Sequence, residues 1–143
     1  MSRPRFHLAF PVHDLEAARR FYGEVLGCPE GRSADHWVDF DLFGHQIVAH
    51  LVEGAARAAG PTNPVDGDEV PVPHFGLLLD WDAFDALAER LTAAGVHFRI
   101  APRVRFVGQP GEQKTMFFED PSGNALEMKA FRRDEDIFAT SLS

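Results

Sequence analysis

The chain has 143 residues, of which 45% are hydrophobic and 25% charged, a composition typical of one globular domain. The net charge of −8 and the pI of about 5.2 argue against nucleic acid or an anionic membrane as the main partner. Cys28 is the only cysteine, so no internal disulfide can form. The sequence shows neither a signal-peptide pattern nor the roughly 18 consecutive apolar residues of a membrane span. We therefore expect a cytoplasmic protein that acts on a small molecule.

In the first half, a strand should begin at His7 and lead into a helix that Asp14 caps. Apolar residues recur at helical spacing in the stretch LEAARRFYGEVL, and Gly27 is suited to the left-handed end of that helix. A linker rich in Ala, Gly and Pro should occupy residues 54–73. Two strands should lie between the helix and the linker, at roughly residues 35–41 and 45–52.

The second half repeats this pattern, with His74 in the place of His7. Asp82 is expected to cap the second helix and Gly95 to end it. The stretch EDPSGN, residues 119–124, is typical of a hairpin turn, because proline fixes one central dihedral angle and glycine accepts a positive φ. Strands are expected at about residues 97–100, 104–107, 115–119 and 124–131.

The repeat predicts an α+β fold of two βαβββ modules, which together form one domain over residues 5–131. The modules should span about residues 5–53 and 74–131, followed by a C-terminal tail at 132–143. Neither half has enough apolar residues for a core of its own. We expect them to share one curved, mostly antiparallel sheet around a metal-centred cleft, with the helices outside.

The metal is inferred from Glu127, which interrupts the apolar run SGNALEMKAF. Burying a lone carboxylate costs several kcal/mol unless it is paired or bound to a cation. The internal symmetry places His7 and His74 at equivalent strand starts, and it puts the counterpart of Glu127 near His50. Such donors suit Fe(II), Mn(II), Ni(II), Co(II) or Zn(II). The alternative is that the histidines are hydrogen-bonded sheet residues and that Glu127 shares a solvated face with Lys129.

The two modules and the motifs FYGEVLG, residues 21–27, and EDPSGNALEMK, residues 119–129, resemble the vicinal oxygen chelate superfamily. That superfamily includes glyoxalase I, extradiol dioxygenases, fosfomycin-resistance enzymes and bleomycin-binding proteins. The stretches HWVDFDLFGHQIVAHL and GEQKTMFFEDPSGNALEMKAF make the chain most similar to small predicted extradiol-type dioxygenases. This resemblance implies that a triad holds Fe(II) and that a further histidine acts as acid/base. In this chain the resemblance implies His7, His74 and Glu127 as the metal ligands and His50 as the acid/base.

Two departures from the resemblance leave alternatives open. In glyoxalase I the strand that corresponds to that of His50 supplies a fourth ligand, normally Glu, so His50 is either a ligand or a proton shuttle. Larger extradiol enzymes place a tyrosine ten residues before the Glu ligand, where this chain has Phe117. We expect a homodimeric dioxygenase that opens the ring of a small catechol-like substrate with O₂. The alternatives are a glyoxalase-like lyase or isomerase that works through an enediolate, and a binding protein without chemistry.

Overall fold

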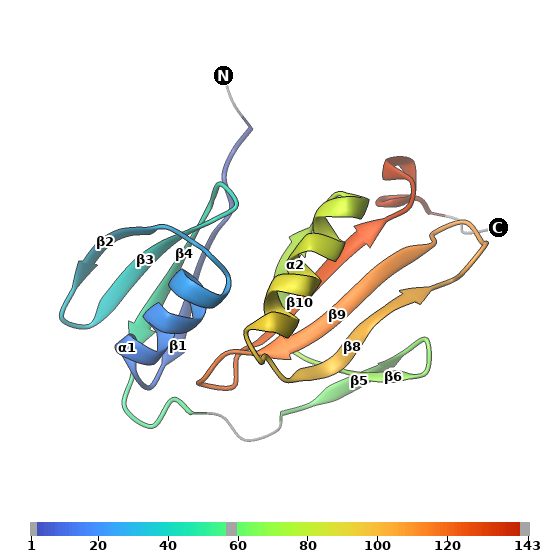
Figure 1. Ribbon diagram of the computed structural model, residues 1–143. Coiled ribbons are helices and arrows are strands. Elements are labelled where there is room, and N and C mark those ends of the chain that lie inside the picture. Colours follow the sequence, from blue (N-terminus) through green and yellow to red (C-terminus); the bar gives the residue numbers. More distant parts are fainter. Residues whose placement is uncertain (1–2, 57–59, 141–143) are drawn as a thin grey trace. The chain divides into compact units, whose positions relative to one another are not determined.

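The protein is described from a computed structural model that covers residues 3–56 and 60–140 (Figure 1). Residues 57–59 of the expected linker and 141–143 of the expected tail lie outside the described residues. The described chain forms two compact units, one of residues 3–56 and 120–124 and one of residues 60–119 and 125–140. No helix in this part of the chain is both long and apolar enough to cross a membrane.

The first unit is a four-stranded sheet with one helical segment packed on it. In spatial order the strands run β1-β4-β3-β2, with β1 parallel to β4 and the other neighbours antiparallel. The helix α1 (Leu15–Ala18) continues without a break as π-helical turns in η1 (Arg19–Val25). The strands are β1 (His7–Val12), β2 (Glu30–Ala34), β3 (Trp37–Leu42) and β4 (His45–Leu51).

Local sequence explains how this helical segment begins, ends and packs. The Asp14 side chain accepts a backbone hydrogen bond in the first turn, as predicted, and Gly27 follows the segment with a φ of 79°. Tyr22 is fully buried, and its ring lies 5.2 Å from that of Phe10 and 5.4 Å from that of Phe40. One face of the sheet is thereby covered by the helix, and alternation along the strands turns His7 and His50 to the other face.

The second unit repeats the topology. Its strands run β7-β10-β9-β8, with β7 parallel to β10. The predicted βαβββ modules and the mostly antiparallel pairing are therefore confirmed. Hydrogen bonding completes a separate sheet in each unit, because β4 and β10 each pair with the first strand of their own module. The elements are β7 (Phe75–Leu78), α2 (Trp81–Ala93), β8 (Phe98–Arg105), β9 (Gln113–Glu119), β10 (Ala125–Phe131) and the 3₁₀ turn η2 (Asp134–Asp136).

The prediction that Asp82 caps the second helix is wrong. The helix begins at Trp81, with Asp80 at the N-cap, so Asp82 lies within the first turn. Packing favours Trp81 at the start of the helix, because two cations lie over its ring. The Lys114 Nζ of β9 is 4.0 Å and the Arg132 guanidinium, just after β10, is 3.9 Å from the ring centroid.

The expected linker contains a hairpin that the sequence did not reveal. Its strands are β5 (Thr62–Val65) and β6 (Asp68–Pro71). Two arginines of β8 hold the hairpin in the second unit: Arg103 pairs with Asp68 at 2.8 Å, and the buried Arg105 pairs with it at 3.1 Å. These charge-assisted contacts add to the apolar packing of Val70, which is buried on β6.

The turn EDPSGN, which connects β9 and β10 as predicted, is organised by Asp120. Its Oδ1 accepts the backbone N–H groups of Ser122 and Asn124, both at 2.8 Å. Its Oδ2 accepts the hydroxyl of Tyr22 at 2.8 Å. Burial, followed by the charge of Asp120, raises the pKa of Tyr22, so the tyrosine stays a neutral donor. The two sequence motifs are therefore joined by one buried hydrogen bond inside the first unit.

Candidate metal centre

His74 and Glu127 meet in the second unit, where Nε2 of the histidine lies 3.1 Å from Oε1 of the glutamate. The parallel register pairs Glu127 with Gly76, two residues after His74. A Cβ atom added to Gly76 would lie 1.6 Å from the carbonyl oxygen of Glu127. Glycine is therefore required for β7 to approach β10 this closely. Two of the predicted ligands are brought together by this register.

The hydrogen bonds of His74 define its tautomer. Its Nδ1–H donates to the carbonyl of Pro71 at 2.6 Å, so Nε2 faces the carboxylate of Glu127. An ionised carboxylate is only an acceptor, so a proton or a metal cation has to lie between the two groups. In the metal-free protein this is a proton, and the hydrogen bond to Glu127 raises the pKa of His74 above its ordinary value. Burial alone would raise the pKa of Glu127, but hydrogen bonds from His74 and Thr115 outweigh it and lower that pKa.

Thr115 holds the other oxygen of the glutamate. It is fully buried on β9, and its hydroxyl donates to Oε2 of Glu127 at 2.5 Å. This contact leaves Oε1 directed at His74. Phe117, the direct cross-strand neighbour of Glu127, packs edge-on against the His74 ring at 5.0 Å. Phe117 is recognisable from its spacing to Glu127, whereas nothing in the sequence marks Thr115. Alternation along β9, together with the pairing of Phe117 and Glu127, places Thr115 on the face of Glu127.

The donor pair fits a divalent metal. Two ligands at about 2.1 Å that subtend a right angle are about 3 Å apart, which agrees with the observed Nε2–Oε1 distance. A metal-binding histidine usually donates its other ring N–H to a carbonyl or carboxylate, as His74 does. Within residues 3–56 and 60–140, no cluster of three or more His, Cys, Asp or Glu side chains is preassembled for a metal. The pair is thus the part of the predicted ligand set that the structure brings into contact.

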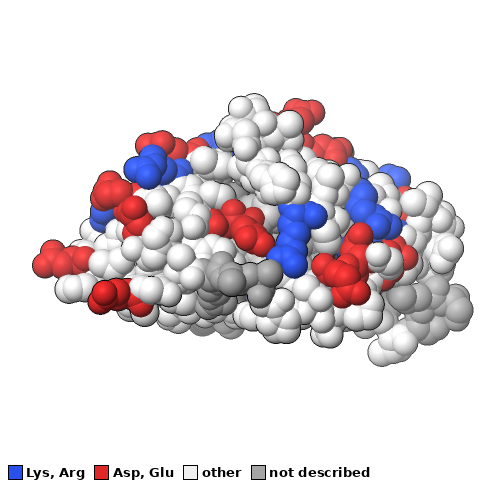
Figure 2. Space-filling model, turned by 90° about the horizontal axis from the view of Figure 1, so that it is seen from below, with Lys and Arg blue, Asp and Glu red and all other residues white. Residues whose placement is uncertain are grey.

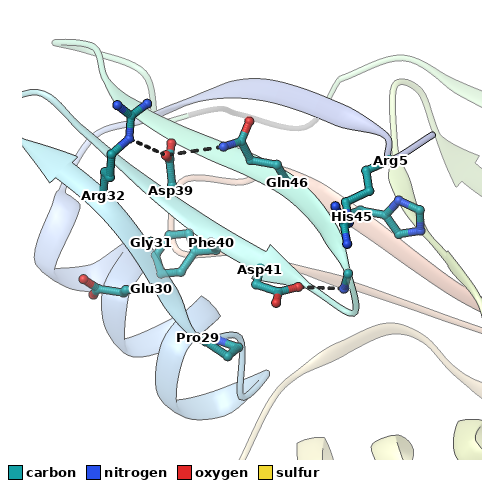
Figure 3. A pocket seen from close by; sticks show the side chains of 11 residues that line it. Arg5, Pro29, Glu30, Gly31, Arg32, Asp39, Phe40, Asp41, His45 and Gln46 are labelled. Atoms are coloured by element: carbon teal, nitrogen blue, oxygen red, sulfur yellow. Dashed lines mark hydrogen bonds and ion pairs between the residues drawn. The ribbon is translucent and has the colours of Figure 1, made fainter. Parts of the chain in front are cut away.

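His7 lies in the first unit, exposed at the start of β1. Like His74, it has an oxygen acceptor at Nδ1. Its Nδ1 is 2.7 Å from Oε1 of Gln46, and the amide nitrogen of Gln46 points at the buried Asp39, 3.4 Å away. This chain of contacts makes Nδ1 the donor and leaves Nε2 of His7 as a free lone pair. Figure 3 shows Asp39 between Gln46 and Arg32, in the wall of a cavity of about 510 Å³ beside β2. No sequence pattern indicates this support for His7.

His50 is not the counterpart of Glu127, contrary to the symmetry argument. In the second unit Glu127 pairs with the residue two after His74, and in the first unit the residue two after His7 is Ala9, which pairs with Val48. His50 lies one pleat further along β4 and is exposed rather than desolvated. Four residues along a strand separate its position from that paired with His7, about 13 Å. This spacing argues against His50 and His7 as ligands of one ion.

On the face drawn in Figure 2, surface charge is mixed rather than concentrated. Acidic and basic side chains lie among one another on the face drawn in Figure 2, which carries no broad basic surface. Arginines are used within the fold, as in the pairs Arg19–Glu16, Arg99–Glu119 and Arg103–Asp66.

Comparison with known proteins identifies the family of the chain. The sequence model of the Glyoxalase/Bleomycin resistance protein/Dioxygenase superfamily matches residues 6–128. The chain belongs to this superfamily. A glyoxalase/bleomycin resistance protein/dioxygenase from Alicyclobacillus acidocaldarius is 34% identical, with a TM-score of 0.80 over 94% of this chain and 96% of the other. The expected resemblance and the predicted fold class are thereby confirmed.

More distant members share the fold alone. The fosfomycin resistance protein FosX from Listeria monocytogenes is 21% identical, with a TM-score of 0.66 over 95% of this chain and 98% of the other. Lactoylglutathione lyase from Agrobacterium tumefaciens is 21% identical, with a TM-score of 0.64 over 90% of this chain and 94% of the other. No curated protein matches the chain. Membership of the superfamily therefore leaves the reaction open.

Proposed function

We propose that the protein is a metal-dependent dioxygenase of extradiol type that opens the ring of a small catechol-like substrate with O₂. The observation that carries the proposal is the His74–Glu127 pair, whose facing lone pairs call for a cation. Fe(II) is the favoured metal, with Mn(II), Ni(II), Co(II) and Zn(II) as alternatives that the same donors accept. A cytoplasmic setting suits Fe(II) and the buried thiol of Cys28.

His7, His74 and Glu127 are proposed to hold the metal. The support lies in the chemistry of each side chain: both histidines have Nδ1 engaged by an oxygen acceptor and Nε2 available. One carboxylate and two imidazoles form the triad that is typical of non-haem Fe(II) oxygenases and leaves positions open for other ligands. His50 is proposed as the acid/base, because its imidazole is exposed and has one nitrogen that can accept a proton and one that can donate a proton.

The proposed reaction is balanced without any further reductant. Both atoms of O₂ enter the catechol, one ring C–C bond beside a hydroxyl-bearing carbon breaks, and the product carries an aldehyde or ketone and a carboxylate. A bound metal would supply Lewis acidity and a route for electrons between substrate and O₂. The chain itself would fix the metal ligands through Pro71, Thr115 and Gln46 and would take up or return the hydroxyl protons at His50.

The glyoxalase-like reading remains the second candidate, because the same ligand pair could stabilise an enediolate. Val48, rather than a carboxylate, occupies the position where such an enzyme would place its fourth ligand. This observation favours the three-donor dioxygenase. A binding protein without chemistry would need no metal, so metal content separates it from both enzymes.

The test is metal analysis of protein purified without added metal or chelator, followed by an aerobic assay with a panel of catechols. We expect about one metal ion per chain and catechol loss that depends on Fe(II) and consumes one O₂ per ring opened. Hemithioacetal turnover with Ni(II) or Zn(II) would instead select the lyase. In the variant His50→Gln, the metal should be retained and turnover should fall by roughly 10²- to 10⁴-fold.

We also propose a homodimer. Each sheet has open edges, at β1 and β2 in the first unit and at β7 and β8 in the second, and soluble proteins usually cover or blunt such edges. Light scattering across micromolar concentrations should give twice the chain mass of 15.9 kDa. A single species at the chain mass would contradict this assembly.

A further inference from the structure

Lys129 lies on the same face of β10 as the proposed metal ligand Glu127. The two residues are two positions apart on the strand. The neighbours of Lys129 across the sheet are Thr115 on β9 and Leu78 on β7. Lys129 is half-buried, and Leu78 beside it is 50% exposed. The ammonium group is thus both close to the candidate metal centre and accessible to a ligand.

Within the described chain, Lys129 lacks the carboxylate that the other inward cations of the second unit possess. Arg105 pairs with Asp68 at 3.1 Å, and Lys114 pairs with Asp85 at 2.9 Å. No described carboxylate lies within 4.0 Å of the Lys129 Nζ, which stands 5.2 Å from the centre of the Phe131 ring. A half-buried ammonium without a carboxylate partner can pair with an anionic group that a ligand supplies.

The charges around Lys129 also favour an anionic ligand. Burial and hydrogen bonds have the larger effects on the pKa values of His74 and Glu127, and the charge of Lys129 also lowers both. The ammonium therefore lies within electrostatic reach of the pair. A divalent metal would add two positive charges, against the one negative charge of Glu127. A ligand that brings both chelating oxygens and a second anionic group would offset the excess.

We propose that Lys129 is a specificity-determining residue that pairs with a carboxylate of the substrate. The substrate class is then a catechol that carries a carboxylate, rather than catechol itself. This inference rests on the proposed function for the chelating part of the ligand. Residues two apart on a strand are separated by about 7 Å, which is comparable to the span from one edge of a substituted benzene ring to the other.

The test compares 3,4-dihydroxybenzoate with catechol on the metal-loaded protein without O₂, with affinities measured by calorimetry. We expect the carboxylate to increase affinity about tenfold in the wild type, the usual scale of one charge-assisted contact. Lys129→Met should bring the ratio of the two affinities close to one without loss of metal. Arg20→Met, which removes one charge at an exposed position of the first unit, should keep the ratio.

A second readout does not depend on the metal. Lys114 and Lys129 are the only lysines, so protein labelled with ¹³C-lysine gives two side-chain ε signals, which Lys129→Met assigns. Benzoate added to the metal-free protein should shift the Lys129 signal and leave that of Lys114, which Asp85 already engages, in place. If benzoate shifts the Lys129 signal but the affinity for catechol is the same with and without metal, the anion site is supported and the dioxygenase is refuted. An unmoved Lys129 signal, or an affinity ratio that survives in Lys129→Met, would overturn the inference.

Discussion

Replacing Thr115 by Val tests whether a buried hydroxyl positions the carboxylate of Glu127, the proposed metal ligand. The two side chains have the same shape, so the change exchanges the hydroxyl for a methyl group. Oγ1 of Thr115 lies 2.5 Å from Oε2 of Glu127, and the Glu127 side chain is only 12% exposed, so little water can replace the lost donor. Hydrogen bonds to charged groups contribute about 1.5–3 kcal/mol. We expect the free energy of unfolding of the metal-free protein to fall by about that amount.

The effect on metal binding should be larger than a packing change could give. Loss of a partner that orients a ligand typically lowers metal affinity by about 10- to 100-fold. Competition with a fluorescent chelator measures this affinity, and urea unfolding of the metal-free protein measures the stability. Thr115→Ser keeps the donor and loses only a methyl group, so it should lose some stability but bind metal nearly as tightly as the wild type.

One control separates the position from the substitution. Thr92→Val changes an exposed threonine of α2 whose hydroxyl donates to the carbonyl of Ala88 at 2.8 Å and not to either residue of the ligand pair. It should leave metal affinity unchanged. If Thr115→Val also binds metal as tightly as the wild type while its circular dichroism stays native, the hydroxyl does not position Glu127 and the reasoning fails.

Three other predictions concern Gly76, Tyr22 and the His74–Glu127 pair. Gly76→Ala should force β7 away from the Glu127 carbonyl and cost at least about 1–3 kcal/mol of stability, together with metal affinity; equal chelator competition would contradict this. Tyr22→Phe should cost about 1.5–3 kcal/mol in urea unfolding, because it removes a buried donor from Asp120; an unchanged midpoint would show that the bond is not stabilising. In the metal-free protein, the His74–Glu127 pair should stabilise most between pH 4.5 and 6.5, the ordinary pKa values of the two groups. Its contribution should fade as pH rises through the raised pKa of His74 or falls through the lowered pKa of Glu127, which pH-dependent unfolding of Glu127→Gln beside the wild type would reveal.

The modules were predictable because their signals are local. Asp14 and Gly27 mark the ends of one helical segment through cap chemistry that depends on a few neighbouring residues. The strand β2, in contrast, consists of five exposed residues with no apolar alternation, so nothing in Glu30–Ala34 distinguishes it from a loop. The hairpin of β5 and β6 depends on arginines about 35 residues further along the chain, which pair with Asp68 only after folding.

The candidate ligands could be recognised in the sequence, and the groups that orient their side chains could not. His74 and Glu127 are chemically conspicuous in apolar surroundings, whereas Thr115 is an ordinary strand residue until the register of β9 and β10 is known. Gln46 was hidden for the same reason, since its role depends on the parallel pairing with His7. Register is a property of two strands together, and a single sequence specifies it only weakly.

The same limitation explains the error at His50, and its correction bears on the reaction. One rung of the parallel ladder holds Gly76 and Glu127 in the second unit, and the equivalent rung holds Ala9 and Val48 in the first. Val48 is buried and apolar, so the first copy offers the imidazole of His7, two residues before Ala9, but no carboxylate at the rung of Val48. Duplication therefore preserved the fold while the two copies diverged at one rung, which leaves three proposed donors instead of four. Three donors leave room at a six-coordinate metal for a bidentate substrate and O₂, and a fourth from the sheet would remove it. The residue that decides between a dioxygenase-like and a glyoxalase-like ligand set is thus Val48, at a position where the sequence alone pointed to His50.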